Sequence, residues 1–340
     1  MFGGVGNDVM TGHEGDDTLT GGDGNDSFYG SAGNDVFYID AGDSTFDGGA
    51  DYDTAYIEGD TGMTLNLYST SIEEVHGSEV GADNLNAQNK TENVVIYGYG
   101  GADTINGGNG NDYLSGGAGV DGLLARAGND TLDGGAGADT LSAYEGDDYL
   151  YVDSDDVTSG YIDGGTGTDT IDVTGTTGVS LTAYSKNVEI IYGSYLGDDS
   201  LQAGSVTAGI ELYGRAGDDT LAGGGYADTL NGGQGVDQIT GGSGADVFDY
   251  NSNGASGTGS GNRDIITDFV TGTDQIDLSD FVGTFTFQGT SAFTGTASEV
   301  RYTQTGGNTI VEIDSDADGT ADLEIELTGT ITLVGGDFIL

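Results

Sequence analysis

A nine-residue repeat constrains this chain more than any other feature of its sequence. Four units run without a gap from Gly3, six run from Gly98 and four run from Gly214, giving fourteen units in register. Each approximates Gly-Gly-x-Gly-x-Asp followed by x-U-x, where U is large and apolar. The sixth position is always Asp, and the fourth is Gly except at Tyr226. A short fixed period of this kind predicts a solenoid built from stacked repeats.

The two halves of a unit have different tasks. The glycines allow positive φ and close backbone approach, so consecutive carbonyls can turn towards one point. In the x-U-x half only the middle side chain points inward, because side chains alternate along a strand. Two units then form a coil of about 18 residues, and coils stack at about 4.8 Å. We therefore predict an all-β fold, a parallel β-roll or β-helix solenoid with a thin apolar core.

A second period of 116 residues overlies the first. Asp47-Gly48-Gly49 recurs as Asp163-Gly164-Gly165, and the segment 65–68 recurs as 181–184. Degenerate units persist between the tracts, around Asp53 and Asp83 and their counterparts Asp169 and Asp199. We predict repeat tracts at 1–47, 98–151 and 214–249, degenerate solenoid coils at 48–97 and 152–213 (a duplicate of 36–97), and a β-rich C-terminal module at 250–340.

The charge of the chain excludes several classes of partner. Lys and Arg number 6 against 58 Asp and Glu, which gives a formal net charge of −52. Such a surface repels nucleic acids and anionic membranes. No apolar run approaches the roughly 18 residues of a membrane span. The first residues also lack the basic and apolar regions of a signal peptide, so we expect any export signal to lie elsewhere.

The stacked aspartates point to calcium. Units two apart lie above one another, so Asp8 comes near Asp26, and such carboxylates repel by about 4 kcal/mol per pair at an effective dielectric of about 20. A divalent cation between the turns replaces this repulsion by a net attraction. Calcium accepts six to eight oxygens in flexible geometry. Zinc prefers His and Cys, of which the chain has two and none.

The consensus resembles the RTX (hemolysin-type) calcium-binding nonapeptide. The resemblance implies a right-handed parallel β-roll with calcium between successive turns, and carboxylates contributed by units n and n+2. About eight or more ions are expected. The implied pairs are Asp8/Asp26, Asp17/Asp35, Asp103/Asp121, Asp112/Asp130, Asp121/Asp139, Asp130/Asp148, Asp219/Asp237 and Asp228/Asp246.

The C-terminal module is similar to the C-terminal region of the serralysin family of secreted metalloproteases. The similarity rests on Asp264-Ile265-Ile266-Thr267-Asp268-Phe269, on 272–278 and on the closing Asp337-Phe338-Ile339-Leu340. It implies a cap on the roll and an uncleaved signal for a type I secretion apparatus, hence an extracellular protein. The alternative is that the closing residues are simply a last strand. Further strands are expected at 284–288, 309–313 and 323–327.

A separate acidic loop lies within this module. Asp314, Asp316 and Asp318 alternate before Gly319, as in an EF-hand-like loop, but Ile325 stands where the bidentate Glu is expected. We predict a calcium-binding β-loop formed by these three carboxylates, with Asp322 as a further candidate. A solvated acidic turn is the alternative.

Catalytic motifs are not apparent in the sequence. His13-Glu14 is not followed by the second His of a zinc protease helix, and there is no Cys nucleophile. We therefore predict no enzyme activity and a secreted structural, surface or matrix component, with cell-surface or matrix polysaccharide as its partner. The alternative is the C-terminal RTX and secretion part of a larger secreted protease, lipase or alginate-modifying enzyme. A membrane-active RTX toxin is less well supported, since long apolar helices are lacking.

Overall fold

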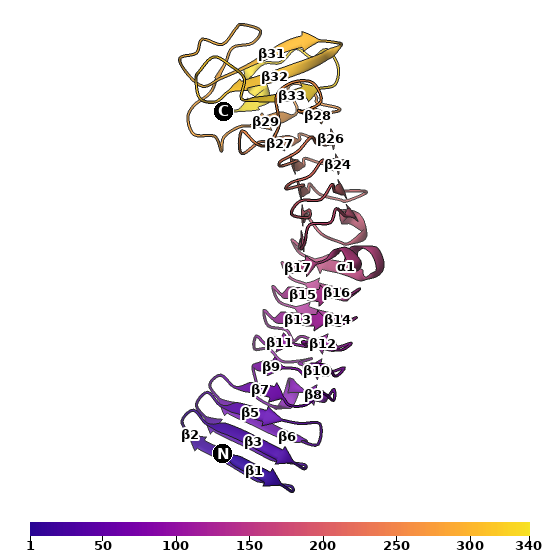
Figure 1. Ribbon diagram of the computed structural model, residues 1–340, viewed down its shortest axis with the longest axis vertical. Coiled ribbons are helices and arrows are strands. Elements are labelled where there is room, and N and C mark those ends of the chain that lie inside the picture. Colours follow the sequence, from indigo (N-terminus) through magenta and orange to yellow (C-terminus); the bar gives the residue numbers. More distant parts are fainter. The chain divides into compact units, whose positions relative to one another are not determined.

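The computed structural model describes residues 1–340, apart from the side chain of Ser69, and confirms the all-β parallel solenoid. The chain divides into two compact units, Met1–Thr170 and Ile171–Leu340. Within each unit, successive strands alternate between two opposed sheets, as the stacked coils of Figure 1 show. β19 (Thr170–Val173) includes the residues at which the first unit ends and the second begins along the chain.

In the first unit one face is a continuous parallel sheet. Its strands are β1 (Phe2–Val5), β3 (Thr18–Asp23), β5 (Val36–Ile39), β7 (Thr54–Ile57), β9 (Glu74–His76), β11 (Val95–Tyr97), β13 (Tyr113–Ala118), β15 (Thr131–Ala136) and β17 (Tyr149–Val152). The opposite face holds β2 (Val9–Glu14), β4 (Ser27–Ala32) and β6 (Thr45–Ala50), and a second set, β8 (Thr64–Asn66), β10 (Asn84–Asn86), β12 (Thr104–Asn106), β14 (Gly122–Ala127), β16 (Thr140–Glu145) and β18 (Tyr161–Thr166).

The second unit continues the same scheme and then changes it. One sheet runs through β21 (Ile190–Tyr192), β23 (Glu211–Tyr213), β25 (Thr229–Asn231), β27 (Val247–Asp249), β29 (Gln275–Asp277) and β34 (Phe338–Ile339). The other runs through β20 (Ser180–Thr182), β22 (Ser200–Gln202), β24 (Thr220–Gly224), β26 (Gln238–Gly242) and β28 (Asp264–Ile266), followed by β33 (Leu323–Leu327), β32 (Asn308–Asp314), β31 (Glu299–Thr305) and β30 (Thr286–Phe287). β32 is antiparallel to both β31 and β33, so the cap ends the parallel stacking.

The core is a column of the eighth-position side chains. Leu114, Leu132 and Leu150 occupy successive strands of one sheet and are fully buried. Their strand neighbours point outward, because side chains alternate between the two faces. A column one residue wide per strand offers little apolar area, so burial of these side chains contributes only a modest part of the stability of each coil.

Three details differ from the sequence-based expectation. Strands in the regular tracts reach six residues instead of three, because the turn glycines join the ladder, as in the pairing of Gly117 with Gly135. Strand β31 was not predicted. A short helix, α1 (Ser154–Ser159), was also missed; the Asp153 side chain caps it by accepting from the backbone N–H of Asp156. Three-residue 3-10 turns lie at η1 (Leu67–Ser69), η2 (Ala183–Ser185) and η3 (Gly335–Asp337).

None of the described helices is long and apolar enough to cross a bilayer.

Candidate metal centres

The sixth-position aspartates form hydrogen-bonded ladders along the turns. The backbone N–H of Asp112 donates to Oδ1 of Asp130 at 2.7 Å, and that of Asp130 donates to Oδ1 of Asp148 at 2.7 Å. Equivalent bonds of 2.7 to 3.0 Å join the other six predicted pairs. All eight predicted pairs are therefore neighbours in the structure.

The ladders are longer than predicted. They continue through eight aspartates that we had not assigned as ligands: Asp43, Asp53, Asp83, Asp156, Asp169, Asp199, Asp264 and Asp274. Four of these lie in the degenerate units already visible in the sequence. Asp264 opens the serralysin-like motif, and Asp156 sits in the capped helix α1. Asp43 and Asp274 carry no nonapeptide signal.

The second carboxylate oxygen defines two kinds of turn. In what we call open turns, Oδ2 is buried and has no hydrogen-bond partner among the described residues. The open turns are those of Asp8, Asp26, Asp35, Asp53, Asp103, Asp121, Asp130, Asp139, Asp148, Asp219, Asp228, Asp237, Asp246 and Asp264. A buried carboxylate oxygen without a partner is costly, so each open turn lacks a positively charged or hydrogen-bonding group.

Closed turns satisfy Oδ2 locally. In the turn of Asp112, Oδ2 accepts from the backbone N–H of Gly108 at 2.6 Å. Asp83 and Asp199 accept at this oxygen from the backbone N–H and hydroxyl of Ser78 and Ser194, respectively. Asp43, Asp156 and Asp274 accept there from nearby backbone N–H groups. Asp112 is thus a predicted ligand whose second oxygen is already bonded within the protein. Asp17 belongs to neither group; it is half-buried and lies in the ladder.

A backbone carbonyl converges with the carboxylate in the open turns. An added Cβ on Gly116 would lie 2.5 Å from Oδ2 of Asp121 and 2.7 Å from the carbonyl oxygen of Gly134. Gly223 has the same surroundings, formed by Asp228 and Gly241. In these two turns the first glycine of the unit therefore keeps free a space bordered by carboxylate and carbonyl oxygens, whereas Ala125 and Ala143 stand at this position in the turns of Asp130 and Asp148. This donor set fits a hard cation such as calcium.

Burial makes ionisation of these carboxyls unfavourable. Desolvation, with a further contribution from neighbouring aspartates, raises the pKa of Asp103 and Asp130 to about 7 and that of Asp219 to about 8. The pKa of Asp264 rises to about 8 for the same reasons. Without a cation, a folded chain at neutral pH holds these groups at a cost in free energy.

The predicted acidic loop near residue 314 is assembled differently from the expectation. Carboxylate oxygens of Asp314, Asp316 and Asp322 all lie within 4.8 Å of one another. Among the described residues, this is the only such group of three or more His, Cys, Asp or Glu side chains. The Asp318 carboxylate instead accepts from the backbone N–H and hydroxyl of Thr320.

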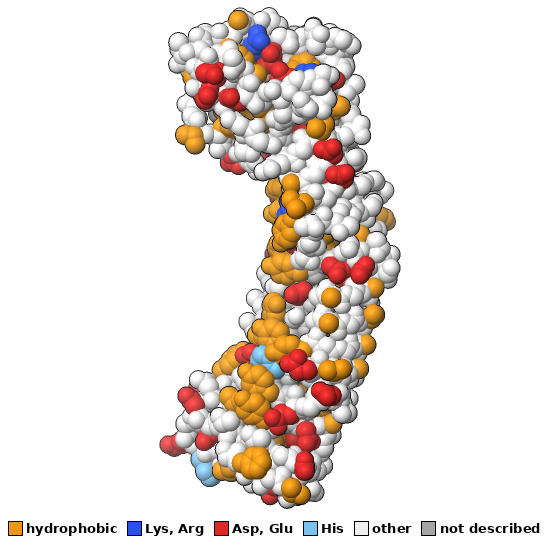
Figure 2. Space-filling view, in the orientation of Figure 1, with side chains coloured by type: hydrophobic (Ala, Val, Ile, Leu, Met, Phe, Trp, Pro, Cys, Tyr) orange, Lys and Arg blue, Asp and Glu red, His pale blue; other side chains and the backbone are white. Residues whose placement is uncertain are grey.

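The two histidines lie apart from these turns. His13 is exposed at a positive φ of 79°. His76 stacks between Tyr56 and Tyr97, with ring centroids 4.3 and 5.0 Å away. In Figure 2, hydrophobic side chains gather in a band over this face of the first unit.

Comparison with known families decides the nature of the repeats. Residues 2–37, 95–123 and 124–158 match the RTX calcium-binding nonapeptide repeat family (four copies). These parts of the chain are RTX calcium-binding nonapeptide repeats. Its residues 200–340 match the family described as Peptidase M10 serralysin C terminal. Both resemblances predicted from the sequence are confirmed. RTX repeats bind calcium, and the two families together indicate a type I secreted, extracellular protein.

Several solved structures are similar to this chain. The AlgE6R2 subunit of the Azotobacter vinelandii mannuronan C5-epimerase is 26% identical, with a TM-score of 0.30, over 48% of this chain and 91% of that one. The AlgE6R3 subunit of the same enzyme is 27% identical, with a TM-score of 0.25, over 52% and 82%. The extracellular lipase LipA from Serratia marcescens is 16% identical, with a TM-score of 0.25, over 85% and 45%. A search of curated proteins found no match.

Proposed function

We propose that this chain is a secreted, non-catalytic RTX protein that folds on binding calcium outside the cell and acts as a structural surface or matrix component. The observation that carries the proposal is the row of buried, unpartnered Oδ2 atoms facing backbone carbonyls. Calcium bound there would supply the positive charge that these oxygens lack. The chain's own residues orient the oxygens and exclude water from them.

The ligands that we propose are those expected from the repeat, and about eight or more ions would bind. They are Asp8, Asp17, Asp26, Asp35, Asp103, Asp112, Asp121, Asp130, Asp139, Asp148, Asp219, Asp228, Asp237 and Asp246. The open turns of Asp53 and Asp264 extend this set. Asp112 would contribute Oδ1 alone unless its bond to Gly108 is given up. In the acidic loop we propose Asp314 and Asp316, with Asp322 nearer to them than the expected Asp318.

Folding and metal binding should be one process in such a chain. The core column is thin, and several turn carboxyls are ionised only at a cost, since their pKa values are raised to about 6 to 8. Cation binding removes that cost only in the folded state, so calcium stabilises the fold by mass action. Extracellular calcium modules often bind at about 10⁻⁴–10⁻³ M, which suits a chain that stays unfolded before export.

A calcium titration followed by far-ultraviolet circular dichroism tests this proposal, with a calorimetric count of bound ions. We expect little β-signal in excess EGTA, a cooperative gain on adding calcium, and no equivalent gain with magnesium. A native β-signal that persists after complete chelation would contradict the proposal.

The C-terminal residues form a strand, and we propose that they also act as the type I secretion signal. β34 pairs with β29, and buried Asp337 accepts from the Thr271 hydroxyl and the Gly272 backbone N–H. Removing residues 337–340 and assaying the culture supernatant separates the two roles. Undiminished export of the shortened chain would show that the signal lies elsewhere.

A second candidate function is favoured by one comparison. The family matching residues 200–340 is described as the C-terminal part of a peptidase, so the chain could serve as the RTX and secretion part of a larger secreted enzyme. An antibody raised against residues 214–340 distinguishes the two candidates. A secreted product much larger than 34.3 kDa would favour the second.

A further inference from the structure

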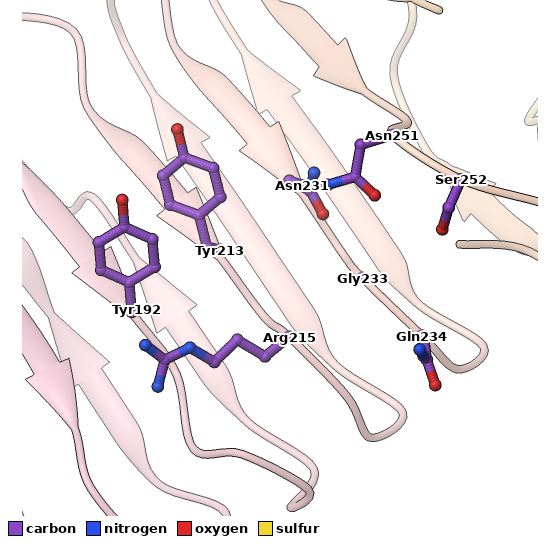
Figure 3. Close-up of a pocket in the computed structure, with 8 residues that line it drawn as sticks. All are labelled: Tyr192, Tyr213, Arg215, Asn231, Gly233, Gln234, Asn251 and Ser252. Atoms are coloured by element: carbon purple, nitrogen blue, oxygen red, sulfur yellow. The ribbon is translucent and has the colours of Figure 1, made fainter. Parts of the chain in front are cut away.

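A groove on the second unit lies along the outward side chains of β21, β23 and β25 and reaches the turns that carry Asp219 and Asp237. It has a volume of about 310 Å³ and is lined by Tyr192, Tyr213, Arg215, Asn231, Gly233, Gln234, Asn251 and Ser252. Figure 3 shows the two tyrosines side by side on neighbouring strands, with the Arg215 side chain extending alongside Tyr192. The volume is at the lower end of the range of about 300–1,000 Å³ for small-molecule sites.

The row of outward side chains explains the shape of the groove. Tyr192, Tyr213 and Asn231 are paired in register on β21, β23 and β25. The two rings stack with centroids 4.7 Å apart and planes 16° apart. Because the next residue in the row is Asn231, the stack ends at Tyr213. The outer face of that ring therefore looks along the row towards amide side chains.

The groove is polar, and its charges are already paired. Arg215 forms an ion pair with Asp172 at 2.8 Å, and its guanidinium carbon lies 5.2 Å from the Tyr192 ring centre. The Asn231 amide donates to Asp249 at 2.8 Å, and the Tyr213 hydroxyl donates to Glu211 at 2.8 Å. An anionic ligand would meet the field of a chain with a net charge of −52, and Arg215, the one charged side chain in the lining, is already paired with Asp172.

The duplicated segment supplies an internal comparison. At the positions 116 residues earlier, the first copy has His76, Tyr97, Tyr99, Ser115 and Ala118 in place of Tyr192, Tyr213, Arg215, Asn231 and Gln234. There the Tyr99 hydroxyl bonds to His76 at 2.7 Å, which ties the two aromatic side chains together. The arginine and the two amides are thus specific to the second copy, although both copies share the coil that carries them.

We propose that this groove binds an uncharged glycan, a short segment of a neutral polysaccharide. The C–H face of a pyranose ring can stack on the electron-rich face of Tyr213. Its hydroxyls both donate and accept hydrogen bonds, which matches the donor and acceptor of the exposed Gln234 and Asn251 amides. The buried Asn231 amide, whose nitrogen donates to Asp249, forms the floor beside them. The inference rests on the proposed function in that the groove exists only in the folded, calcium-loaded chain, and it names a site and a chemical class for the polysaccharide partner.

Isothermal titration of the full chain in excess calcium tests the inference. The neutral probes are cellohexaose, maltohexaose and laminarihexaose, and the anionic probe is hexagalacturonate. The test variant Asn231→Ser with Gln234→Ala restores the residues of the first copy, which that copy's fold already accommodates. Tyr184→Ala is the matched control, because Tyr184 is exposed on the same unit and does not line the groove.

We expect at least one neutral hexasaccharide to bind, with affinity about tenfold weaker in the double variant, or about 1.4 kcal/mol, and unchanged in the control. The inference is overturned if no neutral probe binds the wild type, if hexagalacturonate binds more tightly, or if the double variant binds like the wild type. Circular dichroism on every sample separates the two proposals. If the chain folds with calcium but does not bind glycans, only this inference is contradicted. If it does not fold with calcium, the proposed function is contradicted.

Discussion

Replacing Asp130 by Asn should change stability in opposite directions with and without calcium. Asp130 is buried in an open turn, where Oδ1 accepts from the Asp112 backbone and Oδ2 has no partner. Asparagine keeps an oxygen for that backbone bond but removes the negative charge. A metal ligand and a merely structural carboxylate respond differently to this exchange.

The magnitude follows from the pKa of the carboxyl. Burial, reinforced by Asp112 and Asp148, raises the pKa of Asp130 from 3.8 to about 7. At about 1.4 kcal/mol per pKa unit the ionised group costs the folded, metal-free chain up to about 4 kcal/mol. The turns lie close to solvent, so we halve this to about 2 kcal/mol. In calcium, losing one partner of a buried charge pair costs about 3 kcal/mol.

Thermal and urea unfolding followed by circular dichroism measures both effects. For the metal-free arm, trimethylamine N-oxide in EGTA brings the chain into its folding transition, because this osmolyte favours the compact state. Asp130→Asn should then be more stable than the wild type, and less stable in excess calcium. The control is Asp147→Asn, an exposed change of the same charge, since Asn111 and Asn129 occupy the same ladder position in earlier coils. Equal destabilisation by Asp130→Asn in both conditions would refute the metal-ligand argument.

Three further predictions concern pH, the glycines and the C-terminus. The pKa of Asp219 is raised to about 8, so the folded form binds this proton more tightly than the unfolded form. The metal-free chain should therefore gain stability as pH falls from about 8 to about 4, and lose it as pH rises. Acid titration of the chain in EGTA checks this prediction. Gly116→Ala should place a methyl group among the turn oxygens and raise the calcium concentration at the folding midpoint several-fold. In the control Gly122→Ala, the added Cβ has no neighbour closer than 3.9 Å, so this midpoint should stay unchanged or the fold should become slightly more stable. Removing residues 338–340 should uncover Phe287, which lies 5.2 Å from the Phe338 ring, and lower the melting temperature of the calcium-loaded chain; an unchanged melting curve would contradict the role of β34 in the cap.

The regular part of the fold was predictable because its causes are local and periodic. An inward residue every nine positions and glycines at the turns require stacked coils, and the eight aspartate pairs follow from the 18-residue spacing. The additional pairs break that spacing, except Asp35/Asp53. Asp139 reaches Asp156 across 17 residues through helix α1, and Asp237 reaches Asp264 across 27 residues. No period in the sequence predicts such insertions.

The division into open and closed turns was not predictable either. The unit containing Asp112 has the same consensus as its neighbours, yet a 2.6 Å bond from Gly108 satisfies its second oxygen. That bond depends on how the preceding backbone turns, which the residue types do not reveal. In the acidic loop, Thr320 takes the Asp318 carboxylate, so alternation along the chain did not identify which carboxylates converge.

The aspartate ladder also has a direction. Each donor N–H belongs to an earlier coil and each acceptor carboxylate to a later one, and in the second unit the final acceptors are Asp264 and Asp274, just beyond the regular repeats. The sixth-position N–H of a coil can therefore reach its carboxylate acceptor only after the coil that follows it has formed, whereas fifth-position bonds, as from Asp147 to Asn129, run the other way. We expect folding of the coils to begin where the last acceptors are held and to advance towards the N-terminus, so that each folded coil is the template for the coil before it in the sequence.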